Sequence, residues 1–304
     1  MFAPPPVLAT EVFARVPDTL RIRDRKSRWA AVYRQGRPID CFIEGPSFDR
    51  AGNLYVVDLA WGRILRVTPG GVFSVVVEYD GQPNGLKIHR DGRVFIADRN
   101  RGVLRLDPST GEIATVVGDY QGCPFQGLND LVFADNGDLY FTDQGLSGLD
   151  RPTGRVFRYR ASGVLELVLD GIPSPNGLAL DREESTLFVN VTRDNAVWRV
   201  PMTAAGAACR VGAFIRLSGG IGPDGLAIDS QGSLAIAHLG LGVVWLVSSA
   251  GEPLARVQSC AGTGTTNVAY GGDDGRALFI TESETGQILK AVLPVKGWPM
   301  FSHR

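Results

Sequence analysis

Six polar residues of this 304-residue chain each open a short apolar run, and each carries a side-chain oxygen: Glu44, Asn84, Asn129, Asn176, Asp224 and Asn267. Two carboxylates and four carboxamides that converge on one place are costly to bury unpaired, so they need water, a ligand or a cation. Oxygen ligands with two negative charges suit a hard divalent cation. Ca²⁺ is favoured, Mg²⁺ and Mn²⁺ would also fit, and Zn²⁺, which usually recruits His or Cys, stays an open alternative.

The charge of each residue suggests its role in such a site. We predict Glu44, Asn176 and Asp224 as the core ligands of one divalent cation, and Asn129 as a fourth ligand or a substrate contact. The other two members of the set, expected to contact the substrate, are Asn84 and Asn267.

A cation held in this way predicts hydrolysis of an ester, because it polarises a carbonyl oxygen and activates water. We assign Asp224, Asn129 and His238 to catalysis. Asp224 is the preferred base, since a ligand carboxylate can also reach a metal-bound water. His238 is the alternative base, and a structural histidine with both nitrogens hydrogen-bonded is the competing interpretation.

The six residues recur at intervals of 40 to 48 positions, which indicates a repeated structural unit. Each unit holds two short β-type runs joined by a Gly- or Asn-containing turn, as in "PSFD" and "LYVVD", then a third run and usually a fourth. Four strands per unit without helical periodicity predict a propeller blade. We therefore expect an all-β fold, a six-bladed β-propeller of four-stranded antiparallel blades forming one domain over residues 1–304.

The last unit lacks an outer strand, and "ATEVFARVPD" (residues 9–18) resembles one. This N-terminal strand is expected to complete the last blade and so remove its exposed edge. Residues 19–43 then form an unusually long connection to the first blade. Connections of this length are often functional, so the segment is expected either to fold across the channel mouth as a lid or to pack down the outside of the propeller.

A second row of polar residues ends the second strand of each unit, on the same face as the first row: Asp58, Asp98, Asp143, Asn190, His238 and Glu282. Asp is a common turn residue, so we favour a role in tying loops. Loops on this face are expected to place a collar around the polar floor, built from Trp61, Arg99, Tyr120, Phe125, Gln144 and Ile172. Within it, Trp61 and Phe125 are predicted substrate contacts.

The bulk composition excludes several partners. There are 31 basic and 32 acidic residues, so the balance of charge does not suggest nucleic acid or an anionic membrane surface. No apolar run reaches the length of a membrane helix, and the N-terminus does not resemble a secretory signal, so a cytoplasmic location is expected. The four cysteines are far apart and are expected to be free thiols. The oligomeric state is left open.

Four motifs, "EGPSFD", "LNDLVFADNGDLYFTD", "PNGLAL" and "GPDGLAID", resemble the regucalcin, gluconolactonase and luciferin-regenerating-enzyme family over roughly residues 40–290. The third and fourth units are similar to bacterial drug-responsive lactonases. The resemblance implies one divalent metal in a central channel, and places the family's metal-binding Glu, Asn and Asp on Glu44, Asn176 and Asp224, and the Asn of its "ND" motif on Asn129. It implies hydrolysis of a small-molecule lactone, or less often of a phosphorus ester.

Two positions depart from the family pattern. An Arg that contacts sugar hydroxyls in the polyol-lactone members is replaced by Gly127, and an Asp that holds a second calcium in the phosphatase-type members is replaced by Ala227. We therefore expect a lactone that is apolar, aromatic or carboxylate-bearing to be preferred over gluconolactone. An organophosphate or aryl-ester hydrolase, and a non-catalytic calcium-binding or scaffold propeller, remain the alternatives.

Overall fold

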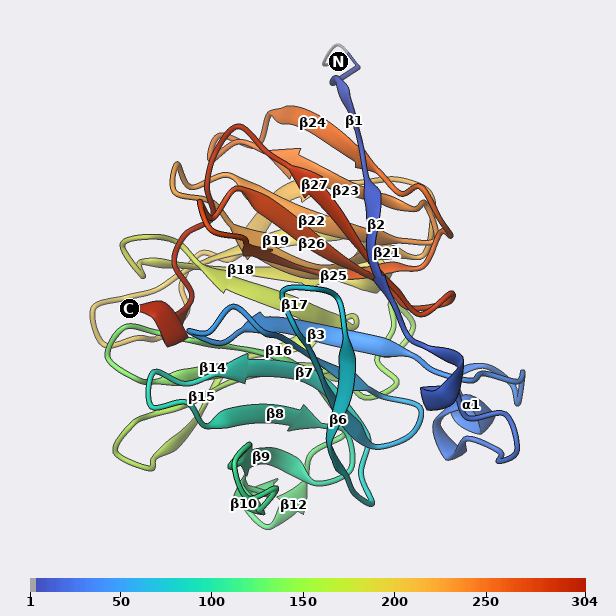
Figure 1. Ribbon diagram of the computed structural model, residues 1–304. Coiled ribbons are helices and arrows are strands. Elements are labelled where there is room, and N and C mark those ends of the chain that lie inside the picture. The colour runs from blue at the N-terminus through green and yellow to red at the C-terminus, as the bar shows by residue number, and fades with distance from the viewer. Residues whose placement is uncertain (1–3) are drawn as a thin grey trace.

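Six antiparallel sheets surround a central channel in the computed structural model, which describes residues 4–304 (Figure 1). The first strand of each sheet packs beside the first strand of the next, and the first strand of the last sheet packs beside that of the first, which closes the ring. The predicted six-bladed propeller is thereby confirmed.

The strands of each blade follow the chain from the channel outward. Blade 1 contains β3 (Ile43–Phe48), β4 (Leu54–Asp58), β5 (Arg63–Val67) and β6 (Phe73–Glu78). Blade 2 contains β7 (Pro83–Ile88), β8 (Val94–Asp98), β9 (Gly102–Leu106) and β10 (Ile113–Val117). Blade 3 contains β13 (Leu128–Phe133), β14 (Leu139–Asp143), β15 (Gly154–Tyr159) and β16 (Leu165–Ile172).

The second half of the ring repeats this order. Blade 4 contains β17 (Pro175–Leu180), β18 (Thr186–Val191), β19 (Ala196–Pro201) and β20 (Gly212–Arg216). Blade 5 contains β21 (Gly222–Ile228), β22 (Leu234–Leu239), β23 (Val243–Val247) and β24 (Pro253–Gln258). Blade 6 contains β25 (Thr265–Gly271), β26 (Ala277–Glu282) and β27 (Gln287–Val292).

Burial falls from the channel outward, as the sequence pattern requires. Every residue of β3 and β4 is buried, whereas the outermost strand β6 has exposed positions. Both faces of an inner strand pack against neighbouring blades, so these runs are apolar on both sides rather than alternating. The inner hairpins turn at glycines with positive φ, such as Gly92 and Gly137 at 89° and 88°, which a residue with a Cβ adopts only with strain.

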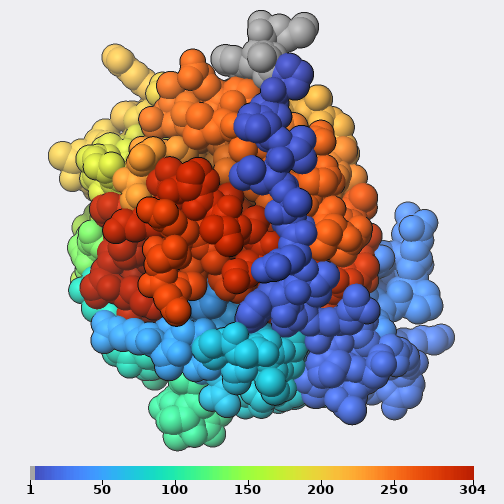
Figure 2. Space-filling model, turned by 45° about the horizontal axis from the view of Figure 1, so that its top comes forward, coloured from blue at the N-terminus to red at the C-terminus, as the bar shows by residue number. Residues whose placement is uncertain are grey.

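The N-terminal chain closes the ring, as predicted. β2 (Glu11–Arg15) pairs antiparallel with β27 and supplies the fourth strand of blade 6. The preceding β1 (Val7–Ala9) pairs parallel with β24 and adds a fifth strand to blade 5, which the sequence did not predict. In Figure 2 this chain lies as a blue strip along the orange and red blades. The N-terminus thus covers the outer edges of two blades.

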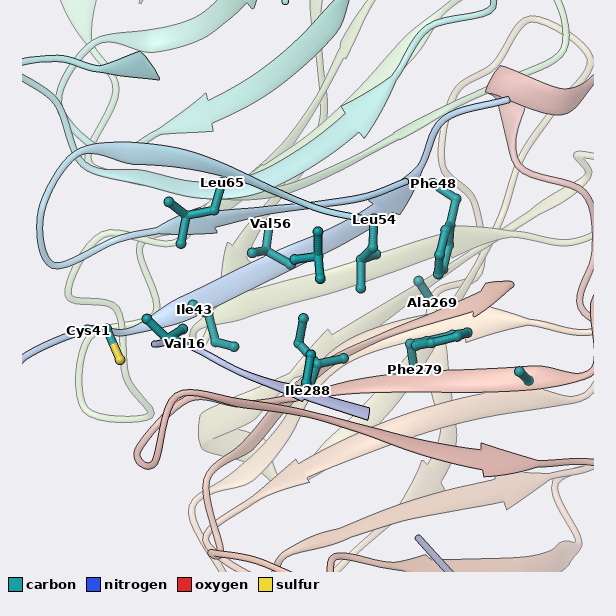
Figure 3. Packing of buried hydrophobic residues seen from close by; sticks show 13 residues of the cluster. Val16, Cys41, Ile43, Phe48, Leu54, Val56, Leu65, Ala269, Phe279 and Ile288 are labelled. Atoms are coloured by element: carbon teal, nitrogen blue, oxygen red, sulfur yellow. The ribbon is translucent and has the colours of Figure 1, made fainter. Parts of the chain in front are cut away.

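Blades 6 and 1 meet at a tightly packed apolar core (Figure 3). Ile43, Val56 and Leu65 of blade 1 are fully buried in it, as is Ile288 of blade 6. Val16, directly after β2, joins the same cluster. Because each such side chain stabilises the fold by about 1.5–3 kcal/mol when buried, this core holds the closure in place without a covalent link.

The connection from β2 to β3 contains the 3₁₀ turn η1 (Asp18–Leu20) and the helix α1 (Arg28–Tyr33). The hydroxyl of Ser27 caps α1 by accepting from the Ala30 amide. The remaining short elements are β11 (Asp119–Tyr120), β12 (Cys123–Pro124), η2 (Thr192–Asp194) and η3 (Phe301–His303). None of the helices in residues 4–304 has the length and apolar character needed to cross a membrane.

The helix α1 and the C-terminal segment lie at opposite ends of the inner strands (Figure 1). α1 stands at the end where β3 begins. At the other end, Trp298, Met300 and Phe301 lie against the inner strands of all six blades and bound an apolar cavity. The channel therefore has an α1 end and a C-terminal end with different coverings.

Candidate functional site

The six predicted ring residues are all buried at the α1 end of the inner strands. Five of them line one cavity: Glu44, Asn84, Asn129, Asn176 and Asp224. Asn267 lies beneath them, where its amide nitrogen donates to Glu44 Oε2 at 2.8 Å and to Asp130 Oδ2 at 3.3 Å. The structure thus brings the predicted set together, with Asn267 in a supporting position.

A β-bulge marks the start of every inner strand. The register between first and second strands shifts at this point in all six blades, for example between Glu44 and Ser47 and between Pro223 and Leu226. A bulge re-aims side chains away from the regular in-and-out alternation. The repeated shift therefore turns each ring residue toward the channel.

Glycine follows the ring residue in four blades, and its reason is steric. A Cβ on Gly177 would lie 2.6 Å from the Asp224 carbonyl oxygen, and one on Gly225 would lie 2.2 Å from Asn267 Oδ1. Only glycine lets adjacent inner strands approach this closely. In blade 3 the equivalent position is Asp130, so a carboxylate stands where four other blades have glycine.

The second polar row holds the loops that lead into the ring. Four of its acids accept a backbone N–H from the loop before their own blade's first strand: Asp58 from Phe42 (3.0 Å), Asp98 from Gln82 (2.8 Å), Asp143 from Gly127 (2.8 Å) and Glu282 from Gly264 (2.9 Å). The donor stands two or three residues before the ring residue. The favoured role of tying loops agrees with this geometry.

Asn190 acts across blades instead. Its amide nitrogen donates to the Asp224 carbonyl oxygen at 2.6 Å and to that of Gly225 at 3.1 Å. Blade 4 thereby fixes the backbone of a predicted ligand in blade 5.

Three carboxyl groups come together at the floor of the cavity: Glu44, Asp130 and Asp224. Burial, and next the charge of Asp130, raise the pKa of Glu44 to about 7. Burial, followed by the charges of Glu44 and Asp130, raises the pKa of Asp224 well above its ordinary value. Crowded buried carboxylates of this kind are stabilised in their charged form by a cation.

Asp130 was not among the predicted site residues. It is buried, lies 3.6 Å from the ammonium of Lys87, and accepts the Leu131 amide at 2.8 Å. Its sequence signal was the "ND" pair itself, in which an acid stands where the neighbouring repeats have glycine. Lys87 lies beside the floor, on the side of the C-terminal cavity.

The donor set fits a hard cation. Among residues 4–304, no three His, Cys, Asp or Glu side chains form a metal-binding group, so a cation here would depend on amide oxygens beside carboxylates. Asn129 and Asn176 supply such oxygens in the same cavity as Glu44 and Asp224. Oxygen ligands of both kinds are those that Ca²⁺ accepts. The raised pKa values of Glu44 and Asp224 show that burial and mutual repulsion disfavour their charged forms, a cost that a bound cation would offset.

His238 lies away from the cavity. It is fully buried, its Nδ1 accepts from the Trp245 indole at 3.1 Å, and its Nε2 lies 3.0 Å from the Gly219 carbonyl oxygen. Burial lowers the pKa of His238 below its ordinary value of 6.5. A neutral ring with both nitrogens engaged has the geometry of a structural histidine.

The predicted collar divides into two groups. Arg99 and Gln144 line the cavity, and their side chains are joined by a 3.1 Å hydrogen bond. The others lie outside its wall: Trp61 packs with the α1 cluster, Phe125 and Tyr120 pack with the core between blades 2 and 3, and Ile172 is buried between blades 3 and 4.

The segment at residues 19–43 provides the aromatic part of the wall. Trp29 and Tyr33 of α1 line the cavity together with the ring. Trp29 packs on Phe42 with ring centroids 4.5 Å apart, and the Tyr33 hydroxyl accepts from Arg99 at 2.7 Å. The segment therefore lies over the mouth side of the channel, where it shapes the entrance.

Comparison with known proteins gives this site a family context. Residues 42–284 match the family described as the SMP-30/Gluconolactonase/LRE-like region. The chain is 30% identical over 274 residues to a gluconolactonase from Zymomonas mobilis, an alignment covering 79% of this chain and 76% of that protein. It is 28% identical over 242 residues to lactonase drp35 from Staphylococcus aureus, covering 75% and 72%.

Solved structures share the fold. A calcium-binding regucalcin from Agrobacterium tumefaciens superposes with a TM-score of 0.79 at 21% identity, covering 98% of this chain and 99% of that chain. A gluconolactonase from Xanthomonas campestris gives 0.74 at 23% identity, covering 97% and 99%. At these identities the likeness shows the six-bladed architecture.

Proposed function

Because the chain belongs to the SMP-30/gluconolactonase/LRE-like family, we propose that it is a lactone hydrolase that depends on one divalent cation in the central channel. Ca²⁺ is the ion we expect, with Glu44, Asn129, Asn176 and Asp224 as its ligands. The gluconolactonase and lactonase relatives support the reaction, and the calcium-binding regucalcin supports the choice of ion.

One observation carries the proposal. Glu44 and Asp224, with Asp130 beside them, are buried in a cavity wall that also holds the amides of Asn129 and Asn176. Burial and mutual repulsion raise the pKa values of Glu44 and Asp224. A propeller that served only as a scaffold would gain nothing from such a floor, since the repulsion lowers stability.

A divalent cation bound here would supply Lewis-acid polarisation of the ester carbonyl and a more acidic water. The protein's own groups do the rest. Asp224 accepts the proton of the attacking water as its oxygen adds to the carbonyl carbon. The acyl C–O bond of the ring then breaks, the proton passes to the departing alkoxide oxygen, and the product is an open hydroxy acid.

The amides of Asn84 and Asn129 lie in the same cavity wall and would orient the lactone. α1 narrows the mouth and reduces the access of bulk water. Separate elements thus provide the two parts of the site. The inner strands supply the ring residues, and the connection at residues 19–43 covers the mouth.

The proposal is tested by a hydrolysis screen on metal-stripped and Ca²⁺-reloaded protein. The panel holds γ- and δ-lactones, an aryl ester and an organophosphate. We expect lactone hydrolysis that chelator abolishes and Ca²⁺ restores. Turnover that chelator leaves unchanged would contradict metal dependence, and turnover of the organophosphate or aryl ester alone would replace the lactone as substrate class.

A further inference from the structure

One buried cation in the cavity wall has no anionic partner among residues 4–304. Arg99, directly after β8, is only 5% exposed and lines the same cavity as the ring. Its guanidinium donates to Gln144 Oε1 (3.1 Å), the Tyr33 hydroxyl (2.7 Å) and the Gly145 carbonyl oxygen (3.1 Å). All three acceptors are neutral.

Burying a guanidinium on neutral acceptors leaves much of its desolvation cost uncompensated. Its Nε has no acceptor among the described residues, and three contacts use three of its five N–H groups. The Tyr33 ring, whose centroid lies 4.4 Å from the Arg99 Cζ, recovers part of the cost through a cation–π contact. The desolvation cost of Arg99 that stays uncompensated favours the binding of an anion at this wall.

Two other arginines at this end of the propeller, Arg21 and Arg155, have carboxylate partners. Arg21 pairs with Asp40 at 2.8 Å, and Arg155 pairs with Asp143 at 2.5 Å. Arg99 forms no such pair within residues 4–304, although it is more deeply buried than most. This buried guanidinium lies where a substrate would bind.

Arg99 also lies close against Gly127. A Cβ on Gly127 would lie 3.2 Å from Arg99 Nη2, and its φ of 145° is itself in the region that favours glycine. Gly127 stands two residues before Asn129, so the guanidinium is held beside the strand that enters the ring. Its place is built by three elements: the loop after β8, the Gln144–Gly145 turn and α1.

We propose that Arg99 is the specificity residue of the cavity and that the substrate is a lactone bearing a carboxylate. This rests on the proposed lactonase function and names its substrate class. The carboxylate lies against the Arg99 guanidinium in a charge-assisted contact, while the ester carbonyl reaches the ring. Hydrolysis adds one water across the acyl C–O bond and yields a hydroxyl group, a second carboxylate and a proton.

The kinetic test uses two lactones that differ only in charge: 5-oxotetrahydrofuran-2-carboxylate and its primary amide. We expect the wild type to favour the carboxylate. Arg99→Leu is expected to lower kcat/KM for the carboxylate roughly 10- to 100-fold, the effect of one lost charge-assisted contact, and to change the amide less than about 3-fold. Arg99→Lys keeps the charge and is expected to retain part of the preference.

Arg193 provides a matched control, because it lines the same cavity but is exposed. The adjacent carboxylate, Asp194, pairs with Arg216 at 2.9 Å and not with Arg193. Arg193→Leu is expected to reduce turnover of the carboxylate lactone less than about 3-fold, since an exposed charge contributes little.

A binding test separates this proposal from the lactonase proposal. Calorimetry with the unreactive ether tetrahydrofuran-2-carboxylate and its amide is expected to show carboxylate binding that Arg99→Leu removes. Binding without hydrolysis of either lactone would overturn the lactonase function and leave the anion subsite standing. Equal wild-type treatment of carboxylate and amide, or equal losses for both in Arg99→Leu and Arg99→Lys, would overturn the specificity role.

Discussion

Asp130 is a further acidic residue beside the predicted cation ligands. It adds a third carboxylate to a floor that two ring residues already make acidic, at a position where glycine stands in four other blades. Nearby negative charge strengthens cation binding even without direct contact. The residue therefore has a measurable role in cation affinity apart from the ligands.

The first prediction compares this residue with a ligand. Asp224→Asn is expected to abolish Ca²⁺ binding and hydrolysis, because it removes one of two ligand charges. Asp130→Asn is expected to weaken Ca²⁺ binding by about 10- to 100-fold, as the loss of an outer partner does. Calorimetry with Ca²⁺ checks both. Unchanged affinity in Asp224→Asn would refute the ligand assignment, and circular dichroism confirms that each variant is folded.

The second prediction concerns His238 and pH. Burial holds the pKa of His238 below 6.5 in the folded protein. As the pH falls below 6.5, His238 therefore becomes protonated more readily in the unfolded chain than in the folded protein. The contribution of this residue to stability is therefore complete above its unfolded pKa and decreases as the pH falls below it. Urea unfolding from pH 8 to pH 5 should show this loss in the wild type and a smaller one in His238→Gln.

Activity measurements then decide whether His238 is also a base. A structural histidine predicts that folded His238→Gln keeps the pH dependence of kcat. Loss of the acidic limb of that profile in the variant would instead assign the proton transfer to His238.

At the scale of elements, the two N-terminal strands have unequal roles. β2 completes blade 6, whereas β1 adds a strand to a blade that already has four. Deleting residues 1–10 is expected to lower the Tm by a few degrees, and deleting residues 1–16 is expected to give aggregated protein, because the edge of β27 and the core around Val16 become exposed. Size-exclusion chromatography and thermal unfolding distinguish the two deletions. Equal behaviour would show that β2 is not the closing strand.

The cover over the mouth is testable as an element too. The amide of Ile22 donates to the Asp40 carbonyl oxygen at 2.9 Å, so the two ends of the segment between these residues lie side by side. Replacing residues 24–37 by a short Gly-Ser linker is expected to preserve folding and to raise KM about 10-fold, because Trp29 and Tyr33 leave the cavity wall. Val32→Ala on the exposed side of α1 is the control. An unchanged KM would show that the segment only packs against the propeller.

Sequence periodicity was enough to predict the ring, since the polar lead residue recurs at intervals of 40 to 48 positions. It could not place single aromatic residues. Phe125 and Trp61 follow strand ends just as Arg99 does, yet both turn into apolar clusters, and only tertiary packing decides this direction. Asp130 could not be predicted for a different reason. The position after the lead residue matters through contacts between neighbouring blades, which the sequence of a single repeat does not contain.

For the whole molecule, the C-terminal segment ties together blades that are far apart in sequence. The Ser302 hydroxyl donates to Phe48 of blade 1 at 3.0 Å, the Trp298 amide to Ile228 of blade 5 at 3.0 Å, and the Gly297 amide to Gly275 of blade 6 at 2.9 Å. Truncation after Pro294 is expected to lower the Tm by at least about 5 °C, because these bonds and the buried Phe301 are lost. A Tm within one degree of the wild type would contradict this role.

The same segment also affects how molecules reach the ring. Trp298, Met300 and Phe301 lie at one end of the channel, and five of the ring residues line the cavity at the α1 end. We expect the lactone to enter and the hydroxy acid to leave at the α1 end. A hydroxy acid that stays bound then blocks the binding of the next lactone. The hydrolysis product should accordingly act as a competitive inhibitor, raising the apparent KM in initial-rate experiments while leaving kcat unchanged.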